Sequence, residues 1–161
     1  MIIRAAGPGD WRQVWPFFRR IVEAGETYAY PEGRTPESAA ALWMEEPPGQ
    51  TVVAVRDGVV VGSAKMGPNR PGRGSHVSTA SFMVDPDHAG GGVGRALGAY
   101  VVEWARTSGY RSMQFNAVVE TNTAAVRLWQ SLGFQILATV PEAFDHARSG
   151  LVGLHVMYLR L

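Results

Sequence analysis

Residues 84 to 97 read Val84-Asp85-Pro86-Asp87-His88-Ala89-Gly90-Gly91-Gly92-Val93-Gly94-Arg95-Ala96-Leu97. Four glycines stand here between an apolar segment typical of a strand and the start of an amphipathic helix. Because glycine has no Cβ, backbone N–H groups in such a turn can point outward. The start of a helix adds unpaired N–H donors and the positive end of the helix dipole. Together these features favour a bound pyrophosphate, so the stretch predicts a site for a nucleotide-like cofactor.

The segments on either side of this turn predict a βαβ unit. A strand over 77–84 comes before the glycines, and a strand over 112–119 follows the helix. The helix is expected over 92–108, where apolar side chains recur at helical spacing. Two strands joined in this way are parallel, and their crossover is right-handed.

The rest of the chain predicts strands that pair as hairpins. Asp57-Gly58 between two apolar runs is a strong hairpin signal. Pro16 falls inside the first helical pattern, which Asp10 precedes as a cap, and is expected to kink or split that helix. Further strands are expected over 2–5, 51–55, 59–66, 134–140 and 155–161, further helices over 37–46, with Thr35 as cap and Pro36 first, and over 122–132, and loops over 67–74 and 141–153.

These elements predict the α+β class. The expected architecture is a mixed, mostly antiparallel central sheet with one parallel βαβ unit, flanked by helices. With 161 residues and no linker-like stretch, residues 1–161 are expected to form a single domain.

Composition excludes several classes of function. The net charge of +1 gives no electrostatic case for nucleic acid. Cysteine is absent, so no disulfide, thiolate nucleophile or cysteine metal site can form. No apolar stretch approaches the ~18 residues of a membrane span, and no signal peptide is evident, so a cytoplasmic location without membrane contact is expected. His88 and His146 have no partners at metal-binding spacing, and no metal is predicted.

The glycine turn alone does not decide the cofactor. A dinucleotide fold would place Gly-x-Gly-x-x-Gly in its first βαβ unit, with an acid about 20 residues further on. Here the turn lies in mid-chain, and the first acid after the next strand is Glu120. A phosphate-binding Walker loop would need Gly-Lys-Ser/Thr, where this chain has Gly94-Arg95-Ala96. The alternative is a tight turn whose glycines serve packing only.

A second motif narrows the choice. About 30 residues after the turn, the chain carries Asn122, Ala125, Leu128, Trp129 and Leu132-Gly133-Phe134. The two motifs together resemble the GNAT superfamily of acyl-CoA-dependent N-acyltransferases, and the resemblance covers most of the chain. That family's phosphate loop, Gln/Arg-x-x-Gly-x-Gly/Ala, falls on Ala89, Gly92 and Gly94.

The resemblance implies acetyl-CoA as the co-substrate and a set of residues that bind it. The backbone N–H groups of Phe82 and Val84 are implied to contact the acyl carbonyl and the pantetheine arm. The full implied set is Phe82, Met83, Val84, Ala89, Gly90, Gly91, Gly92, Val93, Gly94, Arg95 and Asn122.

Two positions depart from the family pattern. Ala89 replaces the usual Gln or Arg, which removes a side-chain contact and leaves Arg95 as a source of charge. Trp129 replaces the tyrosine that serves as the customary general acid, and an indole N–H donates a hydrogen bond but does not titrate usefully. Trp129 is therefore expected to pack in the core beside Ala125 and Leu132.

Narrower resemblances concern the acceptor. The run Phe115 to Asn122 is similar to fungal N-acetyltransferases acting on proline analogues, which implies that Asn122 and Asn116 position acetyl-CoA. Those proteins often have asparagine where this chain has Thr79. Gly25-Glu26-Thr27 is similar to phosphinothricin-type acetyltransferases. The residues expected to bind substrate are Tyr28, Tyr30, Thr79 and Asn116.

The catalytic candidates are Glu26, Glu120 and Asn122. Glu26 is the first choice of general base, with Glu120 next; the alternatives are a solvated charge at a helix end and a loop carboxylate. His76 is a further candidate but is more typical of an exposed strand edge, and a chain of water molecules can also accept the proton. Asn122 is expected to cap the last helix, which is compatible with a cofactor contact.

The leading hypothesis is an acetyl-CoA-dependent N-acetyltransferase that acts on the amine of a small molecule or amino acid. The alternatives are a protein N-terminal or lysine acetyltransferase and a CoA-binding sensor domain without turnover. A homodimer is possible.

Overall fold

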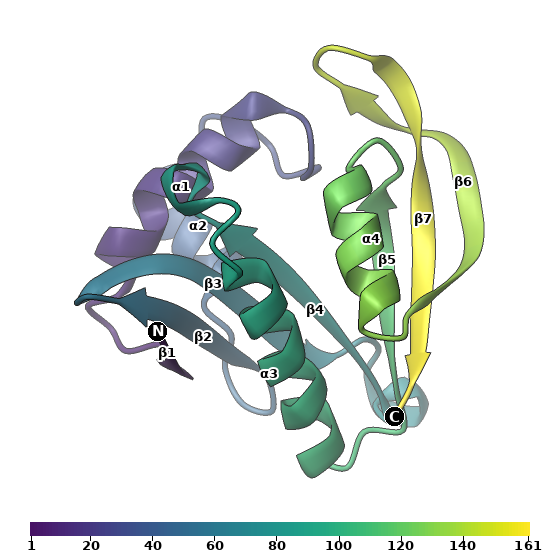
Figure 1. Cartoon of the computed structure of the whole chain (residues 1–161), viewed down its shortest axis with the longest axis horizontal. Helices are drawn as coiled ribbons and strands as arrows, with labels where there is room; N and C mark the ends of the chain where they lie inside the picture. Colours follow the sequence, from purple (N-terminus) through teal and green to yellow (C-terminus); the bar gives the residue numbers. More distant parts are fainter.

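A computed structural model describes residues 1–161 (Figure 1). Seven strands form one sheet, and helices cover both of its faces. Along the chain the elements are β1 (Ile2–Ala5), α1 (Trp11–Ala24), α2 (Pro36–Trp43), β2 (Gln50–Arg56), β3 (Val59–Pro68), the 3₁₀ turn Gly72–Gly74, β4 (Val77–Val84), the 3₁₀ turn Pro86–His88, α3 (Val93–Thr107), β5 (Ser112–Val119), α4 (Thr123–Ser131), β6 (Gln135–His146) and β7 (Gly150–Arg160).

The strand order is β1-β2-β3-β4-β5-β7-β6. Every neighbouring pair is antiparallel except β4 and β5, which are parallel and are joined through α3. The α+β class, the mixed sheet and the parallel βαβ unit are therefore confirmed.

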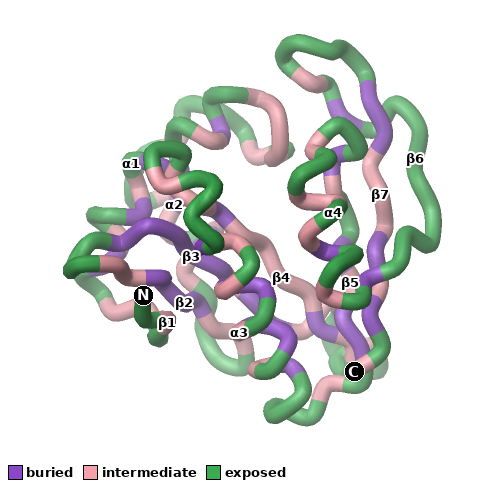
Figure 2. Tube along the Cα trace, in the orientation of Figure 1, coloured by how far each residue is buried: buried purple, intermediate pink, exposed green.

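Two apolar cores lie on opposite faces of the sheet. Strand β2 shows the alternation, because Val52 and Ala54 pack against α3 and α4 while Val53 packs against α1 and α2. Successive strand residues point to opposite faces, so a strand covered on both sides is apolar at every position. This burial explains the unbroken run Val52-Val53-Ala54-Val55 (Figure 2).

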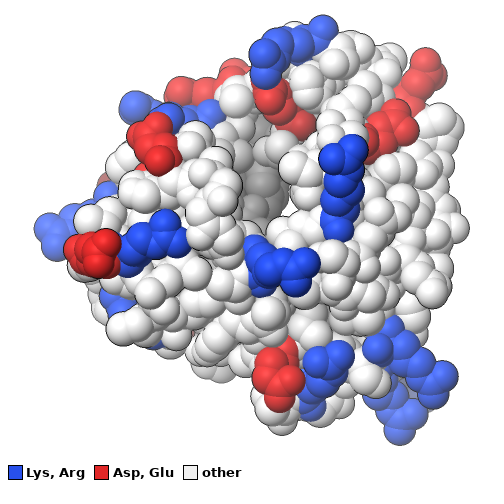
Figure 3. All heavy atoms as spheres, in the orientation of Figure 1, with Lys and Arg blue, Asp and Glu red and all other residues white.

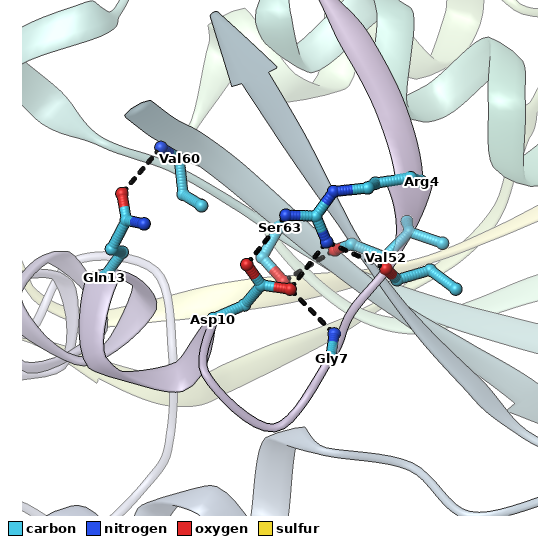
Figure 4. A network of polar contacts seen from close by, with 8 residues as sticks. Arg4, Gly7, Asp10, Gln13, Val52, Val60 and Ser63 are labelled. Atoms are coloured by element: carbon cyan, nitrogen blue, oxygen red, sulfur yellow. Dashed lines mark hydrogen bonds and ion pairs between the residues drawn. The ribbon is translucent and has the colours of Figure 1, made fainter. Parts of the chain in front are cut away.

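The corner between β1 and α1 is built on Asp10 (Figure 4). Asp10 stands at the N-cap position of α1, but its carboxylate accepts from no helical N–H. It accepts instead from Arg4, at 2.7 and 2.9 Å, and from the Gly7 N–H at 2.7 Å. The Arg4 guanidinium lowers the pKa of the Asp10 carboxyl. In the next turn the Gln13 side chain accepts from the Val60 N–H of β3 at 3.0 Å, which ties the helix to the sheet.

Helix α1 runs through Pro16 without a break, so the expected split is wrong. Proline removes one N–H from the helix interior and frees the carbonyl of Arg12. Both Pro16 and Arg12 are exposed, where water can bond that carbonyl.

Helix α2 ends three residues earlier than the expected 37–46. Its start is as expected, with Pro36 in the first turn and Thr35 accepting from the Ser38 N–H. At its end the Thr51 hydroxyl donates to the carbonyl of Trp43 and accepts from the N–H of Glu45. A side chain from β2 thus takes over the helical bonds, and Glu45 and Glu46 lie in the connection to β2.

The largest correction concerns residues 141–153, which were expected to be a loop. They form the end of β6 (Gln135–His146), the turn that follows it and the start of β7 (Gly150–Arg160), so that the two strands make one long hairpin. β6 is the edge of the sheet and is exposed over nearly its whole length (Figure 2). A strand exposed on both faces has no need for apolar alternation, so its sequence is typical of a loop.

None of the helices combines the length and the apolar character that crossing a membrane would require.

Candidate functional site

Strands β4 and β5 separate soon after they meet. They pair only at Val77 with Ser112 and at Ser78 with Met113, and then diverge toward their carboxyl ends. A cavity of about 790 Å³ opens between them, lined by the second halves of both strands, the start of α4 and the segment 27–30. Figure 3 shows a deep hollow at this place. The cleft lies where the two parallel strands β4 and β5 separate, beside the glycine turn.

The register of β4 decides which backbone groups face the cleft. The Val77 carbonyl accepts from Asn69, and the Asp85 N–H donates to Val61, so odd-numbered residues of β4 bond to β3. Bonding direction alternates along a strand, and Ala80, Phe82 and Val84 therefore direct their backbone groups toward β5 and the cleft. This is the edge that the resemblance predicts for contacts to the acyl carbonyl and the pantetheine arm.

The glycine turn presents unpaired donors at the start of α3. Gly90 and Gly92 adopt positive φ values of 78° and 76°, which favour glycine. Across residues 90–95 no backbone N–H donates to another group of the protein. These donors stand at the positive end of a helix of 15 residues. The geometry fits the expected anion site.

Gly94 has a packing role as well. A Cβ at Gly94 would lie 3.3 Å from Leu128 Cδ2 on α4. One turn further on, a Cβ at Gly98 would lie 2.7 Å from Leu132 Cδ1 and 3.0 Å from the Trp129 ring. α3 and α4 thus approach closely along a glycine stripe, and the sequence motif combines an open turn with a tight helix contact.

Helix α4 brings Asn122 and Trp129 to the wall of the cleft. The Asn122 side chain accepts from the Ala125 N–H at 3.3 Å, so the expected cap is present. Trp129 is 7% exposed and packs against Phe82 and Phe115, with ring centroids 4.6 and 5.0 Å apart. Its indole lies in the core and also lines the cavity.

The structure brings most of the predicted binding residues together. Those that line the cavity are Tyr28, Tyr30, Thr79, Phe82, Met83, Val84, Ala89, Asn116 and Asn122. Gly90, Gly91, Gly92, Val93 and Gly94 continue from Ala89 into α3. The Arg95 guanidinium donates to the Ser131 hydroxyl at 2.8 Å, and Arg56 donates to the Gly91 carbonyl at 2.9 Å.

The two candidate bases lie outside the cavity lining. Glu26 forms an ion pair with Arg148 of the β6–β7 turn, and beside it the Ala147 N–H donates to the Gly25 carbonyl at 2.9 Å. Glu120 accepts from the Gly153 N–H at 2.6 Å and so joins the end of β5 to β7. The exposed His76 precedes Val77 at the closed end of the cleft. The assignment of the base stays a prediction.

A second cavity, of about 620 Å³, adjoins the first. Tyr30, Thr79, Ala80, Ser81 and Asn116 belong to both, while the other walls come from the end of β3 and from the α2–β2 and β3–β4 connections. The sequence analysis did not predict the four charged residues of these walls, which are Glu45, Glu46, Lys65 and Arg70. Glu45 pairs with Lys65 at 3.0 Å, whereas the Glu46 carboxylate has no partner in the protein. Nothing in the sequence places the α2–β2 connection beside β4, because that contact arises from the folding of the sheet.

Burial changes the pKa of one group in the cleft, the Tyr28 phenol. The Tyr28 phenol is enclosed between Tyr30, Trp43 and β4, and this desolvation raises its pKa well above the ordinary value. The phenol stays protonated wherever the protein is folded near neutral pH. No three His, Asp and Glu side chains are grouped in a way that can hold a metal ion.

Known proteins share these motifs and this fold. Residues 15–134 match the acetyltransferase (GNAT) family. The chain belongs to this family. The match spans both motifs, from the middle of α1 to the start of the β6 segment, so the fold and the family are those of N-acetyltransferases.

Solved structures agree over nearly the whole chain. A GCN5-related N-acetyltransferase from Kribbella flavida is 57% identical, with a TM-score of 0.97 over 99% of this chain and 97% of that one. The acetyltransferase yncA of Salmonella typhimurium, solved with its cofactor acetyl-CoA, is 27% identical, with a TM-score of 0.84 over 100% of this chain and 94% of that one.

Among curated relatives, the L-amino acid N-acyltransferase MnaT of Escherichia coli is 34% identical over 124 residues, which are 76% of this chain and 66% of MnaT. The chain spans less than two thirds of the length of the curated relatives that it matches first.

Proposed function

We propose that this GNAT chain is an acetyl-CoA-dependent N-acetyltransferase that acts on the amine of a small molecule or amino acid. One observation carries the proposal: N–H donors without a partner at residues 90–95 lie beside the edge of β4 that faces the cleft. One end suits a pyrophosphate, and the other suits an acyl carbonyl. The similarity to yncA, which was solved with acetyl-CoA, supports the same cofactor.

Acetyl-CoA supplies an acyl thioester, in which the C–S bond breaks as a C–N bond to the amine forms. The residues of this chain bind, orient and move protons around that exchange. The N–H groups of 90–95 hold the pyrophosphate, and the Phe82 edge receives the carbonyl. Trp129 and Phe82 form an apolar wall that keeps water away from the thioester.

The second cavity supports an acceptor of small size. Its volume of about 620 Å³ lies within the ~300–1,000 Å³ range of small-molecule pockets. It meets the first cavity at Thr79 and Asn116, which are therefore placed between donor and acceptor. The similarity to MnaT, an L-amino acid N-acyltransferase, supports an amino acid as the acceptor.

The test is release of free thiol from acetyl-CoA with a panel of acceptors: single amino acids, small amines, peptides with free N-termini and lysine-containing peptides. We expect amino acids or small amines to give the fastest release. Release with peptides alone would favour a protein acetyltransferase. Tight binding of acetyl-CoA without release in any well would favour a sensor domain.

Two further proposals concern the whole chain. Residues 1–161 act as one domain, which is supported by the single sheet that contains all seven strands. Two copies pair through β6, which is supported by its open edge and by Leu137 and Val140, 59% and 51% exposed. An exposed apolar edge strand is a template for pairing with another chain. The cytoplasmic location stays a prediction.

A further inference from the structure

Phe82 faces the open cleft, yet a single side chain satisfies both of its backbone groups. The Tyr28 hydroxyl accepts from the Phe82 N–H at 2.9 Å and donates to the Phe82 carbonyl at 2.6 Å. The two residues are 54 positions apart in the sequence. On the same edge, Ala80 and Val84 receive no side-chain hydrogen bond. Tyr28 therefore replaces a neighbouring strand at one residue only.

The surroundings hold this hydroxyl in place. The Tyr28 ring stacks on Tyr30, with centroids 5.4 Å apart and planes at 9°, and meets the edge of Trp43 at 6.1 Å. Because burial raises the pKa of its phenol, Tyr28 keeps the proton that it donates to Phe82. The contact is thus a packed feature of the free protein.

The phenolic oxygen stands where a ligand carbonyl would stand. A carbonyl oxygen that accepts from a backbone N–H lies 2.7–3.2 Å from the nitrogen, and the Tyr28 oxygen lies within that range of Phe82. Two oxygens cannot occupy one position along the same N–H.

We propose that the Tyr28 hydroxyl is a stand-in for the acyl carbonyl, and that acetyl-CoA, but not CoA, has to displace it from Phe82. The inference rests on the proposed function, since it takes acetyl-CoA as the ligand. CoA ends in a thiol and carries no carbonyl at its sulfur, so it leaves the contact intact. Tyr28 is then a residue that sets the preference between substrate and product forms of the cofactor.

Displacement also reaches the acceptor side. Tyr30 stacks on Tyr28 and lines both cavities. Movement of Tyr28 away from Phe82 therefore changes the shape of the second cavity. The second cavity therefore takes its final shape only after acetyl-CoA has bound.

The experiment compares binding of acetyl-CoA and of CoA by calorimetry in the wild-type chain, in Tyr28→Phe and in Tyr110→Phe. Tyr28→Phe keeps the ring and frees the Phe82 groups. We expect its Kd for acetyl-CoA to fall by about three- to tenfold, in line with the loss of one or two neutral hydrogen bonds from the free state, while its Kd for CoA is unchanged. Tyr110→Phe is the matched control, because Tyr110 packs against Trp104 and lines neither cavity, and its ratio of the two Kd values should equal that of the wild type.

A second measurement needs no variant. Hydrogen exchange of the segment 27–30 in the wild-type chain should rise when acetyl-CoA binds and stay constant when CoA binds. This result decides the question if Tyr28→Phe does not fold.

The outcomes separate the two proposals. An acetyl-CoA Kd that stays the same or rises in Tyr28→Phe, or an equal shift for both ligands, overturns the stand-in role alone. A wild-type chain that binds neither ligand overturns the proposed function, and the stand-in role with it.

Discussion

Asp10 carries much of the polar structure at the corner between β1 and α1. It is 8% exposed and binds Arg4 through both carboxylate oxygens, as well as the Gly7 N–H. A second aspartate, Asp87, has a similar two-pronged contact with Arg20, but it lies on the surface. The two pairs differ in burial rather than in geometry, which makes them a natural comparison.

We expect Asp10→Asn to lower the free energy of unfolding at pH 7 by about 1–3 kcal/mol, since it weakens partly buried bonds to a charged group. Arg4 holds the pKa of Asp10 below its ordinary 3.8. The contribution of this carboxylate is therefore present above about pH 4 and is lost as pH falls through the lowered pKa. Urea unfolding across this pH range should show the wild type and the variant converging in acid.

Asp87→Asn is the control for burial. The exposed pair with Arg20 is expected to contribute little to stability, because water and salt screen it. A loss as large as that of Asp10→Asn, or a difference between Asp10→Asn and wild type that does not change with pH, would contradict this account.

The choice of general base is open to a direct comparison of Glu26→Gln and Glu120→Gln. We expect Glu26→Gln to lower turnover steeply and to leave acetyl-CoA affinity nearly intact, because the Glu26 carboxylate pairs with Arg148 and bonds to none of residues 82–95. Glu120→Gln should instead reduce thermal stability, because Glu120 joins β5 to β7 through Gly153. Steady-state rates and melting temperatures measure both effects.

The opposite pattern, with turnover lost only in Glu120→Gln, would exchange the two roles. If neither variant loses more than a few-fold, the next variant is Glu46→Gln, since Glu46 lines the second cavity without a partner. Retained activity in all three would leave water as the proton acceptor.

Helix α3 combines two functions that separate along its length. At its start Gly92 has a positive φ and open space around it, while Gly98 packs against α4. We expect Gly92→Val to weaken acetyl-CoA binding in a folded protein, because it distorts the turn that presents the free N–H groups. Gly98→Ala should do the reverse, with a stability loss of about 1–3 kcal/mol from crowding and little change in affinity. Calorimetry and urea unfolding distinguish the two, and unchanged affinity in folded Gly92→Val would rule out the cofactor role.

The elements around the cleft could be predicted from the sequence because each is covered by others. β4, α3 and β5 bury one or both faces, and burial of a face requires apolar residues at the spacing typical of a strand or a helix. Strands over 134–140 and 155–161 were predicted, but the part of the β6–β7 hairpin formed by residues 141–153 was not, because β6 has one neighbour and little cover. Of its residues 141–146 only Phe144 is buried, and Pro141 is tolerated at an edge that needs no N–H.

The site divides in the same way. The position of residues 82–95 and of Asn122 at or beside the cleft could be predicted, because local sequence motifs contain them. The contact of Tyr28 with Phe82, the partner of Glu26 and the position of Glu46 could not, since each joins segments that only the folded sheet brings together.

At the scale of the whole molecule, pairing of two copies through β6 makes a simple prediction. Leu137→Lys adds a charge to the exposed edge and is expected to shift a dimer to monomer, as charged side chains on edge strands oppose pairing. Sedimentation at several concentrations measures the mass. Leu151→Lys is a control of similar exposure on β7, away from the open edge. A wild-type chain that sediments as a monomer at all concentrations would contradict the dimer.

The two halves of the sheet meet at both ends of the cleft. β4 and β5 pair at one end, and the bonds of Gly25 to Ala147 and of Glu26 to Arg148 close the other. The chain therefore borders the cleft at both of these places, and Figure 3 shows a deep hollow with atoms at its floor. We therefore expect an acceptor to enter this hollow with its amine end first, so that the width of that end limits which amines react.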